Sequence, residues 1–266
     1  MMQAKENLMP ESSIQFGGTE RLYGKAASLK LRQSRVAIIG IGGVGSWTAE
    51  ALARIGVGQL ILVDMDEICS SNLNRQVHAT EGSVGIPKTE AMRKRIGSIS
   101  SATQVEEGFY FFNEKNADTF FSTAPDVVID CIDSIPHKCL LISQCKQRGV
   151  PVVTVGGAGG RRDPSQIQRV DLSRTHGDAL LHRVRKKLRQ KFDFPRNTKK
   201  KWGIPAVFSA ELVHYPQSDG SVCAQREADS NLRLDCESGY GTAGFVTGTF
   251  GFMAAASAVD VLVMDL

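Results

Sequence analysis

A short apolar run that leads into a glycine-rich turn constrains the fold of this chain most strongly. RVAIIG, residues 35–40, is rich in β-branched residues and ends in glycine, which is typical of a buried strand. GIGGVGSWTAEALARIGV follows, a glycine turn that opens a helix whose apolar residues include Trp47, Leu52 and Ile55. A strand, a glycine turn and a helix in this order predict the start of a parallel, doubly wound α/β sheet.

The alternation of strands and helices continues to about residue 160. Further strands are expected at 59–66, 104–112, 125–133 and 151–160, with helices at 87–99, 116–124 and 138–150. The rhythm then changes to an extended segment at 165–173, a basic stretch at 182–202, a strand at 206–216 and a helix at 243–263. No linker rich in Pro, Gly or Ser separates two domains. We therefore predict one domain over 1–266, with an N-terminal helical arm (14–34), a nucleotide-binding core (35–160) and an elaborated C-terminal half (161–266).

Composition excludes several classes of protein. The 266 residues are 42% hydrophobic and carry a net charge of +4, which is ordinary for a globular protein. None of the six cysteines forms a CxxC pair, so neither a disulfide scaffold nor a close-spaced zinc site is expected. Residues 1–18 lack the organisation of a secretory signal. Residues 243–263 are apolar but rich in Gly, Ala, Ser and Thr, which favours a buried helix over a membrane span. We expect a cytoplasmic protein that does not bind membranes.

The glycine turn indicates a nucleotide site. Gly40, Gly42, Gly43 and Gly45 lie between a strand and a helix, where backbone N–H groups can approach a phosphate. Asp64 lies at the end of the next strand, where a carboxylate can bind ribose hydroxyls. An NAD enzyme fits these residues equally well.

Three further residues favour a triphosphate. Arg75 and Lys88 follow the second strand, and cations are needed there because charge builds on pyrophosphate when a carboxylate attacks the α-phosphorus of ATP. Asp133 ends the expected fourth strand, where a carboxylate can hold Mg²⁺ on the phosphates. Taken singly, Arg75 and Lys88 could be surface charges and Asp133 a helix cap. Together, at the ends of successive strands, they predict an ATP site.

GIGGVG, DMD followed by SSNLNRQ, GIPK and DCIDS together resemble the E1-like adenylating family, which includes MoeB, ThiF and the ubiquitin-activating enzymes. The resemblance runs from about residue 18 to the C-terminus and implies a Rossmann-like sheet of the E1/ThiF adenylation type, ATP and Mg²⁺ as cofactors, and a homodimer. It implies that Asp64 binds the ribose, that Arg75 and Lys88 bind phosphates, and that Asp133 holds Mg²⁺. Asp66 and Asn74, in the matching motifs, join the nucleotide site.

The family also implies an arginine from the N-terminal arm that reaches the triphosphate, commonly from the partner subunit. Arg21, in GGTERLYG, is the best match, although this motif departs from the RYxRQ of MoeB and ThiF. Whether Arg21 acts in cis or in trans stays open. Cys236 could be a nucleophile, as in the E1 thioester enzymes, but no sequence neighbour obviously lowers its pKa, so we expect a structural thiol.

One branch of the family matches more of the chain. FGGTERLYG, SWTAEALARIG, GGAGGRRDPSQIQ, VFSAELVHYPQSDGSVCA and DCESGYGTAGFVTGTFGF resemble the tRNA threonylcarbamoyladenosine dehydratases. This implies ATP-dependent cyclisation of N6-threonylcarbamoyladenosine at position 37 of tRNA through an adenylated carboxylate. The alternative is adenylation of a ubiquitin-like sulfur-carrier protein, with a cysteine desulfurase or sulfur acceptor system as a candidate partner. Such activators usually keep two CxxC pairs, which this chain lacks. A nucleotide-sensing module without activity is disfavoured by Arg75, Lys88 and Asp133.

The basic stretch offers a surface for RNA. Ten of the nineteen residues from Arg183 to Lys201 are Lys or Arg. Leu181, Val184, Leu188 and Phe192 fall on one helical face, with Arg183, Lys186 and Lys187 on the other, and a solvated helix explains this pattern alone. Residues 196–202, which we call the lysine loop, continue the charge. Cations beside an aromatic suit a phosphate backbone and a stacked base. The candidate RNA contacts are Arg183, Lys186 and Lys187 of the helix and Arg196, Lys199, Lys200, Lys201 and Trp202 of the loop. An acidic carrier protein could use the same surface.

Overall fold

One seven-stranded sheet organises the molecule, in the order β3-β2-β1-β4-β5-β7-β6. The computed structural model describes residues 15–197, 199–225, 241–264 and 266. The strands are β1 Arg35–Ile39, β2 Gln59–Val63, β3 Gln104–Gly108, β4 Val127–Asp130, β5 Val152–Val155, β6 Ile167–Asp171 and β7 Pro205–Ser209. All neighbouring pairs are parallel except β6 and β7. The predicted doubly wound, mostly parallel sheet is confirmed.

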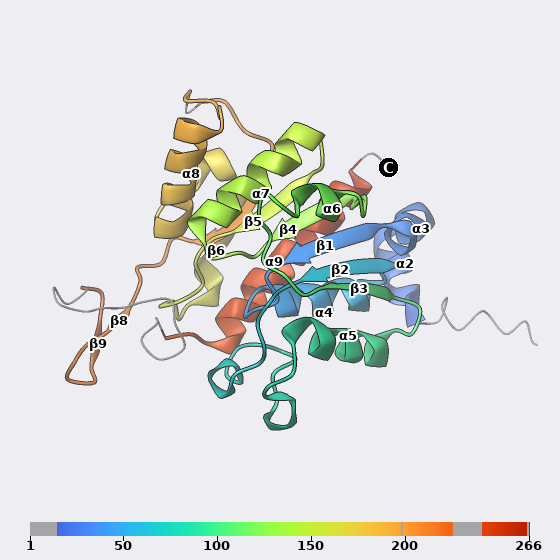
Figure 1. Ribbon diagram of the computed structural model, residues 1–266, viewed down its shortest axis with the longest axis horizontal. Helices are drawn as coiled ribbons and strands as arrows, with labels where there is room; N and C mark the ends of the chain where they lie inside the picture. The colour runs from blue at the N-terminus through green and yellow to red at the C-terminus, as the bar shows by residue number, and fades with distance from the viewer. Residues whose placement is uncertain (1–14, 198, 226–240, 265) are drawn as a thin grey trace, which may run out of the picture.

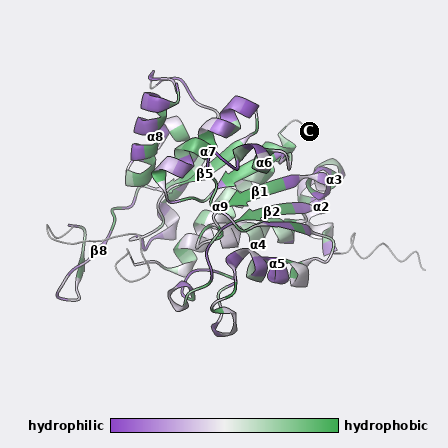
Figure 2. Cartoon of the chain, in the orientation of Figure 1, coloured by the Kyte–Doolittle hydropathy of each residue, from purple (hydrophilic) through white to green (hydrophobic). Residues whose placement is uncertain are grey.

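Helices cover both faces of the sheet, as Figure 1 shows. They are α2 Gly17–Tyr23, α3 Lys25–Gln33, α4 Gly45–Ile55, α5 Lys88–Ile99, α6 Ala117–Phe121, α7 Ile135–Arg148, α8 Ala179–Lys191 and α9 Gly244–Val263. Val36 and Ile38 pack with α3, α4, α5 and α9, while Ala37 and Ile39 pack with α6, α7 and α8. Because alternate side chains of a strand point to opposite faces, two apolar layers require strands that are apolar throughout. Figure 2 shows most of β1 and β2 as hydrophobic, with hydrophilic residues at their amino ends.

The last helix, α9, is a core element. It is long and apolar enough to cross a membrane by composition. However, its residues Val246, Phe250, Ala254 and Ala258 are fully buried in the layer shared with α4 and the sheet. Its small residues permit that close packing, and the predicted buried helix is confirmed.

Several boundaries differ from the sequence predictions. The N-terminal arm is two helices, because Gly24 adopts a φ of 86° between α2 and α3. The strand expected at 206–216 ends at Ser209, and Tyr215–Pro216 forms a separate strand, β8, which pairs with β9, Val222–Cys223. The fourth strand ends at Asp130, three residues before the predicted end at Asp133, because the Asp130 carboxylate accepts a hydrogen bond from the Ile132 backbone and turns the chain.

Candidate active site

The glycine turn joins β1 to α4 at the carboxyl edge of the sheet. Gly40 has a φ of 92°, and a Cβ there would lie 2.9 Å from the Cys131 carbonyl oxygen. A Cβ on Gly45 would lie 1.8 Å from the Gly40 carbonyl oxygen, so neither position tolerates a side chain. Among the described residues, no side chain caps the N-terminus of α4. Its N–H groups and the positive end of the helix dipole are therefore available to an anion.

Asp64 ties the glycine turn to the end of β2. Its carboxylate accepts hydrogen bonds from the backbone N–H groups of Ile41, at 2.6 Å, and Asp66, at 2.9 Å. Burial raises the pKa of Asp64, and the nearby Lys88 ammonium and the two backbone donors oppose that shift. The carboxylate is thus fixed beside the turn where the sequence predicted a ribose-binding group.

Lys88 lies at the start of α5 and is buried. Its ammonium is 2.7 Å from the Asp66 carboxylate and 3.9 Å from that of Asp64. The backbone N–H of Lys88 also donates to the Asp66 carbonyl oxygen, which brings the two residues together. Lys88 therefore reaches the edge of the sheet that carries Asp64, but in this structure it is paired with carboxylates.

Arg75 is a cation without an acidic partner among the described residues. Its guanidinium donates to the Ser71 carbonyl oxygen at 2.6 Å and to the Asn74 side-chain oxygen at 3.1 Å. Its aliphatic stem lies against the glycine turn, 3.4 Å from the position of a Cβ on Gly43. Gly42, next in the turn, faces open space. Arg75 is placed to meet an anion that the turn binds.

Asp133 is exposed in the loop between β4 and α7. The helix N-cap is Ser134, so the alternative that Asp133 caps α7 is not supported. Asp130, the other carboxylate of DCID, is fully buried and bonded to Lys138 and Thr154. Only Asp133 of the two is therefore accessible to a metal ion.

The described residues contain no cluster of three or more metal-ligating side chains. A single accessible carboxylate still fits Mg²⁺, which commonly takes one or two protein carboxylates together with substrate phosphates and water. Charge leads to the same conclusion. Asp64, Asp66 and Asp133 carry three negative charges at this edge against the two positive charges of Lys88 and Arg75. A triphosphate therefore needs further positive charge.

Arg21 is not brought to this edge within one chain. It is exposed on α2, which Figure 1 places near the opposite ends of the strands. A Cβ on Gly56, at the end of α4 away from the glycine turn, would lie 2.9 Å from the Phe16 ring, and Gln15 donates to the Ile99 carbonyl oxygen at the end of α5. The arm therefore packs at the amino edge of the sheet.

The basic stretch divides into a helix and a loop, as predicted. Leu181, Val184 and Leu188 of α8 are buried, and Arg183 and Lys186 are exposed. In Figure 2 the outer surface of α8 is hydrophilic. Lysines 199–201 and Arg196 of the lysine loop are all exposed. The Asp171 carboxylate accepts hydrogen bonds from the backbone N–H groups of Trp202, Gly203 and Ile204, which fixes the end of this loop on β6.

Trp202 packs part of its ring against the protein. Its ring packs edge-on against Phe194, with centroids 4.8 Å apart, and the Arg189 guanidinium lies 5.2 Å from its centroid. It is half-buried at the margin of the apolar layer that contains α7 and α8. Trp202 therefore anchors the end of the loop, and its contact with a stacked base stays a prediction.

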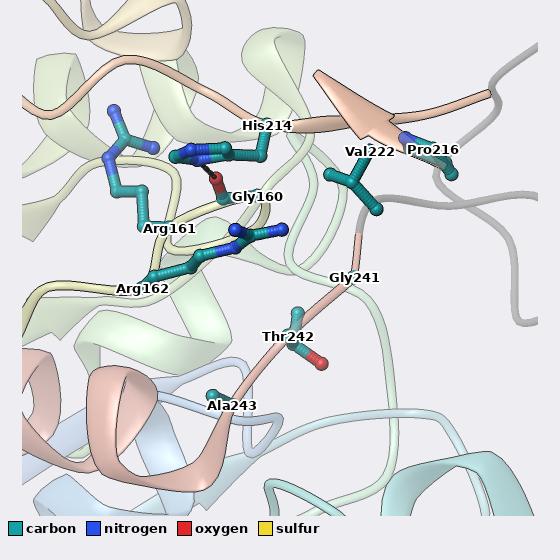
Figure 3. A pocket seen from close by; sticks show the side chains of 9 residues that line it. All are labelled: Gly160, Arg161, Arg162, His214, Pro216, Val222, Gly241, Thr242 and Ala243. Atoms are coloured by element: carbon teal, nitrogen blue, oxygen red, sulfur yellow. Dashed lines mark hydrogen bonds between the residues drawn. The ribbon is translucent and has the colours of Figure 1, made fainter. Parts of the chain in front are cut away.

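A separate cavity of about 270 Å³ is lined by residues from the C-terminal half of the chain. Figure 3 shows Arg162, His214 and Thr242 among the side chains that line it. The Thr242 carbonyl oxygen accepts a hydrogen bond from the Asn74 side chain at 3.0 Å, so the cavity adjoins the segment that carries Arg75. Sequence reasoning did not identify it, because it joins residues 160–162 to residues 214–222 and 241–243.

Three cysteines that pack against the sheet, Cys131, Cys139 and Cys145, have raised pKa values. Cys131 lies beside the glycine turn, and burial raises its pKa to about 12. Burial also raises the pKa of Cys139 to about 11 and that of Cys145. Thiols of this kind are poor nucleophiles. Cys236 lies outside the described residues.

Comparisons with known proteins identify a family and several similar proteins. The model of the ThiF family matches residues 18–265. The tRNA threonylcarbamoyladenosine dehydratase of Escherichia coli (strain K12) is 46% identical over 245 residues, which cover 92% of this chain and 91% of that protein. The protein of the same name from Haemophilus influenzae is 42% identical over 247 residues, covering 93% and 92%. A crystal structure of the E. coli dehydratase, TcdA, in complex with ATP superposes with a TM-score of 0.85 at 39% identity and covers 97% of both chains.

Proposed function

Because the chain belongs to the ThiF family, we propose that it catalyses the ATP-dependent dehydration of N6-threonylcarbamoyladenosine in tRNA. The observation that carries this proposal is the glycine turn with Asp64, Lys88 and Arg75 at one edge of the sheet, in a chain that matches dehydratases over nine-tenths of its length. The position of the modified nucleoside is expected to be 37, and the enzyme is expected to act in the cytoplasm.

The first step forms an acyl adenylate. A carboxylate oxygen of the threonyl group attacks the α-phosphorus of ATP, and the bond from that phosphorus to the bridging oxygen of pyrophosphate breaks. Arg75 and Lys88 would stabilise the charge that builds on the departing pyrophosphate. Asp64, held by the backbone of Ile41 and Asp66, would bind ribose hydroxyls and set the position of the α-phosphorus.

The second step closes a ring. A nucleophilic atom within the modification attacks the activated carbonyl carbon, loses its proton and expels AMP. The carboxylate oxygen that was bonded to the α-phosphorus leaves as part of AMP. The modified nucleoside therefore loses one water overall. No protein nucleophile is needed, which agrees with the high pKa values of the buried cysteines.

Mg²⁺ is proposed as a cofactor, with Asp133 as the residue that would hold it. Bound to the phosphates, it would neutralise negative charge that Lys88 and Arg75 do not balance. Asp133→Asn should fold normally, because Asp133 does not cap α7, yet it should weaken Mn²⁺ binding to the ATP complex. Electron paramagnetic resonance of Mn²⁺ measures this directly, and unchanged binding would remove Asp133 from the metal site.

A homodimer is proposed on the position of Arg21. Arg21 is exposed at the amino edge of the sheet, so within one chain it does not lie beside the glycine turn. A second copy could deliver its arm to the site and supply the missing positive charge. The same site would then be complete only in the dimer.

The tRNA would meet the lysine loop. Arg196, Lys199, Lys200 and Lys201 are exposed, and the loop is fixed to the core through Asp171 and Trp202. A fixed array of cations suits a phosphate backbone, because ordering costs less on binding. Arg183 and Lys186 of α8 extend the charge along an exposed helix face.

Adenylation of a sulfur-carrier protein is the second candidate, with a cysteine desulfurase or sulfur acceptor system as its partner. It is less well supported, because the described residues hold no metal cluster of the kind those activators usually keep, and the dehydratases match nearly the whole chain.

ATP–pyrophosphate exchange separates the two functions. We expect exchange with tRNA that carries threonylcarbamoyladenosine and none with tRNA that lacks it. Exchange that requires a carrier protein, and not tRNA, would establish the second candidate instead.

A further inference from the structure

The main chain of Arg75 is held by two helices that lie far apart in the sequence. The indole N–H of Trp47, on α4, donates to the Arg75 carbonyl oxygen at 3.0 Å. The Thr247 hydroxyl, on α9, lies 3.3 Å from the same oxygen. A carbonyl oxygen has two lone pairs and can accept both hydrogen bonds. The single proton of Thr247 is shared with the carbonyl oxygens of Ala243 and Gly244, so the Trp47 bond is the stronger of the two.

Close packing of α9 fixes the indole. A Cβ on Gly251 would lie 2.7 Å from the Trp47 Cβ and from the Val44 carbonyl oxygen. The Phe252 ring meets the indole edge-on, with centroids 5.8 Å apart. Because α9 presents glycine to α4, Trp47 is held between the two helices with its N–H toward Arg75.

The segment is attached to α9 at a second point. The Asn74 side chain donates to the Thr242 carbonyl oxygen at 3.0 Å, just before α9 begins. A Cβ on Gly244 would lie 3.0 Å from the Asn74 carbonyl oxygen, so the first turn of α9 and residues 74–75 are in direct contact. By contrast, the Arg75 guanidinium makes no ion pair among the described residues. The main chain is fixed while the charged group is left for a ligand.

We propose that Trp47 and Thr247 are positioning residues, which hold Arg75 for the phosphates of the nucleotide. This inference rests on the proposed binding of ATP. A cation whose backbone is already fixed loses less conformational freedom when it meets the triphosphate. Trp47 acts through the main chain of Arg75. Thr247 also packs its methyl group against the glycine turn, 3.2 Å from the position of a Cβ on Gly43, and Thr247→Val keeps that methyl group.

Two substitutions test the proposal. Thr247→Val keeps the side-chain volume nearly constant, whereas Trp47→Phe also removes one ring of the indole. Trp47→Phe removes the N–H, and Thr247→Val removes the hydroxyl. We expect Trp47→Phe to weaken ATP binding by roughly three- to tenfold, the range of one partly buried hydrogen bond, and Thr247→Val by roughly twofold. Binding of adenosine, which has no phosphate, should change less than twofold. Isothermal titration calorimetry gives the dissociation constant for ATP. Displacement of bound adenosine by ATP gives the dissociation constant for adenosine.

A double-mutant cycle distinguishes positioning from general stability. In an Arg75→Met background, Trp47→Phe should not weaken ATP binding further. Thr249→Val is the matched control, because the Thr249 hydroxyl donates to the Phe245 carbonyl oxygen of its own helix and should leave both ligands unaffected.

Equal losses for ATP and adenosine, or a full Trp47→Phe effect without Arg75, would overturn the proposal. If the Trp47→Phe protein does not fold, the double-mutant cycle of Thr247→Val with Arg75→Met tests the proposal instead. A wild-type protein that does not bind ATP would instead refute the proposed function.

Discussion

Lys138 and Asp130 form a fully buried ion pair beneath the loop that carries Asp133. The Lys138 ammonium is 2.9 Å from the Asp130 carboxylate and 2.9 Å from the Ile132 carbonyl oxygen. Burial raises the pKa of Asp130, while Lys138 and the Thr154 hydroxyl oppose that shift. The pair therefore sets the path of residues 130–133 from inside the protein.

Removing one partner of this pair should destabilise the fold. Lys138→Met leaves a buried carboxylate without its counter-charge, so the free energy of unfolding should fall by about 3–5 kcal/mol. Lys146→Met, on the exposed side of the same helix, loses only a contact with the Phe194 ring and should cost less than about 1 kcal/mol. Urea unfolding measures both, and equal effects would contradict a special role for the pair.

His78 makes stability depend on pH. Burial, with the charges of Lys88 and Arg95, lowers the pKa of His78 to about 4. Neither ring nitrogen contacts a polar atom among the described residues. Between pH 6.5 and about 4, the unfolded chain binds a proton at His78 and the folded chain does not. Its contribution to stability is therefore complete above the unfolded pKa and is lost as the pH falls toward the folded value.

From this shift we expect the free energy of unfolding of the wild-type protein to fall by about 2 kcal/mol more between pH 7 and pH 5 than that of a His78→Gln variant. His182→Gln, at an exposed position of α8, is the control and should keep the wild-type pH dependence. Urea unfolding at the two pH values gives the comparison. The same pH dependence in all three proteins would show that His78 does not titrate in this way.

At the scale of elements, the end of the lysine loop at Trp202 is fixed to the sheet. Although partial burial raises it, hydrogen bonds from Ser173 and from the backbone of Trp202 and Gly203 hold the pKa of Asp171 below its ordinary value. The carboxylate is therefore charged at neutral pH and anchors the loop on the sheet. The three lysines project from a fixed base.

Replacing Lys199, Lys200 and Lys201 with Gln should weaken tRNA binding and flatten its salt dependence. Each lost phosphate contact reduces the slope of log K against log salt by about 0.7–0.9. The matched control replaces Lys30, Lys94 and Lys115, three exposed lysines elsewhere. Fluorescence anisotropy across a salt series measures the slope. A slope equal to that of wild type would remove the lysine loop from the RNA interface.

Periodicity predicted the elements that local sequence determines. β1, β2, α4 and α5 were recognisable because their apolar residues follow strand or helix spacing and because Gly45 and Pro87 mark helix starts. The antiparallel pairing of β6 could not be predicted, because it depends on contact with β7, which lies beyond α8. The end of β4 was misplaced because the Asp130 carboxylate that bonds the Ile132 backbone and turns the chain is itself held by Lys138 and Thr154, a contact that forms only in the folded protein.

The charged residues of the candidate site could be predicted from the sequence. The residues that hold them in position could not. Asp64, Arg75 and Lys88 follow recognisable motifs at strand ends, and the structure brings Asp64 and Lys88 to within 3.9 Å. Trp47 and Thr247 carried no signal, because the bond that gives them a role forms only when α9 packs on α4. The packing of Trp202 on Phe194 could not be predicted, because a tryptophan beside lysines has the same sequence pattern whether or not its ring packs against the protein.

At the scale of the whole molecule, the edge that carries Asp64 and the arm that carries Arg21 lie at opposite ends of the strands. A two-fold dimer can join one to the other, since it places the same surface of each subunit against its partner. Such a dimer would supply the positive charge that the site lacks for a triphosphate. Activity would then require residues from both chains.

Complementation tests that arrangement. Arg21→Ala and Lys88→Ala proteins should each be inactive, and subunit exchange between them should restore up to about one quarter of wild-type activity. This is expected because half of the dimers are mixed and each mixed dimer has one intact site. Initial rates of AMP release after mixing provide the measurement. If mixing restores no activity, Arg21 acts within its own chain or lies outside the site.

The central claim, dehydration driven by adenylation, is tested most directly by the mass of the modified nucleoside. Purified protein, ATP and tRNA that carries threonylcarbamoyladenosine are incubated, and the nucleosides are analysed by mass spectrometry. The nucleoside should lose the mass of one water, with one AMP and one pyrophosphate released for each molecule converted, and no loss should occur without ATP. An unchanged nucleoside mass, in a protein that forms AMP only with a carrier protein, would contradict the account.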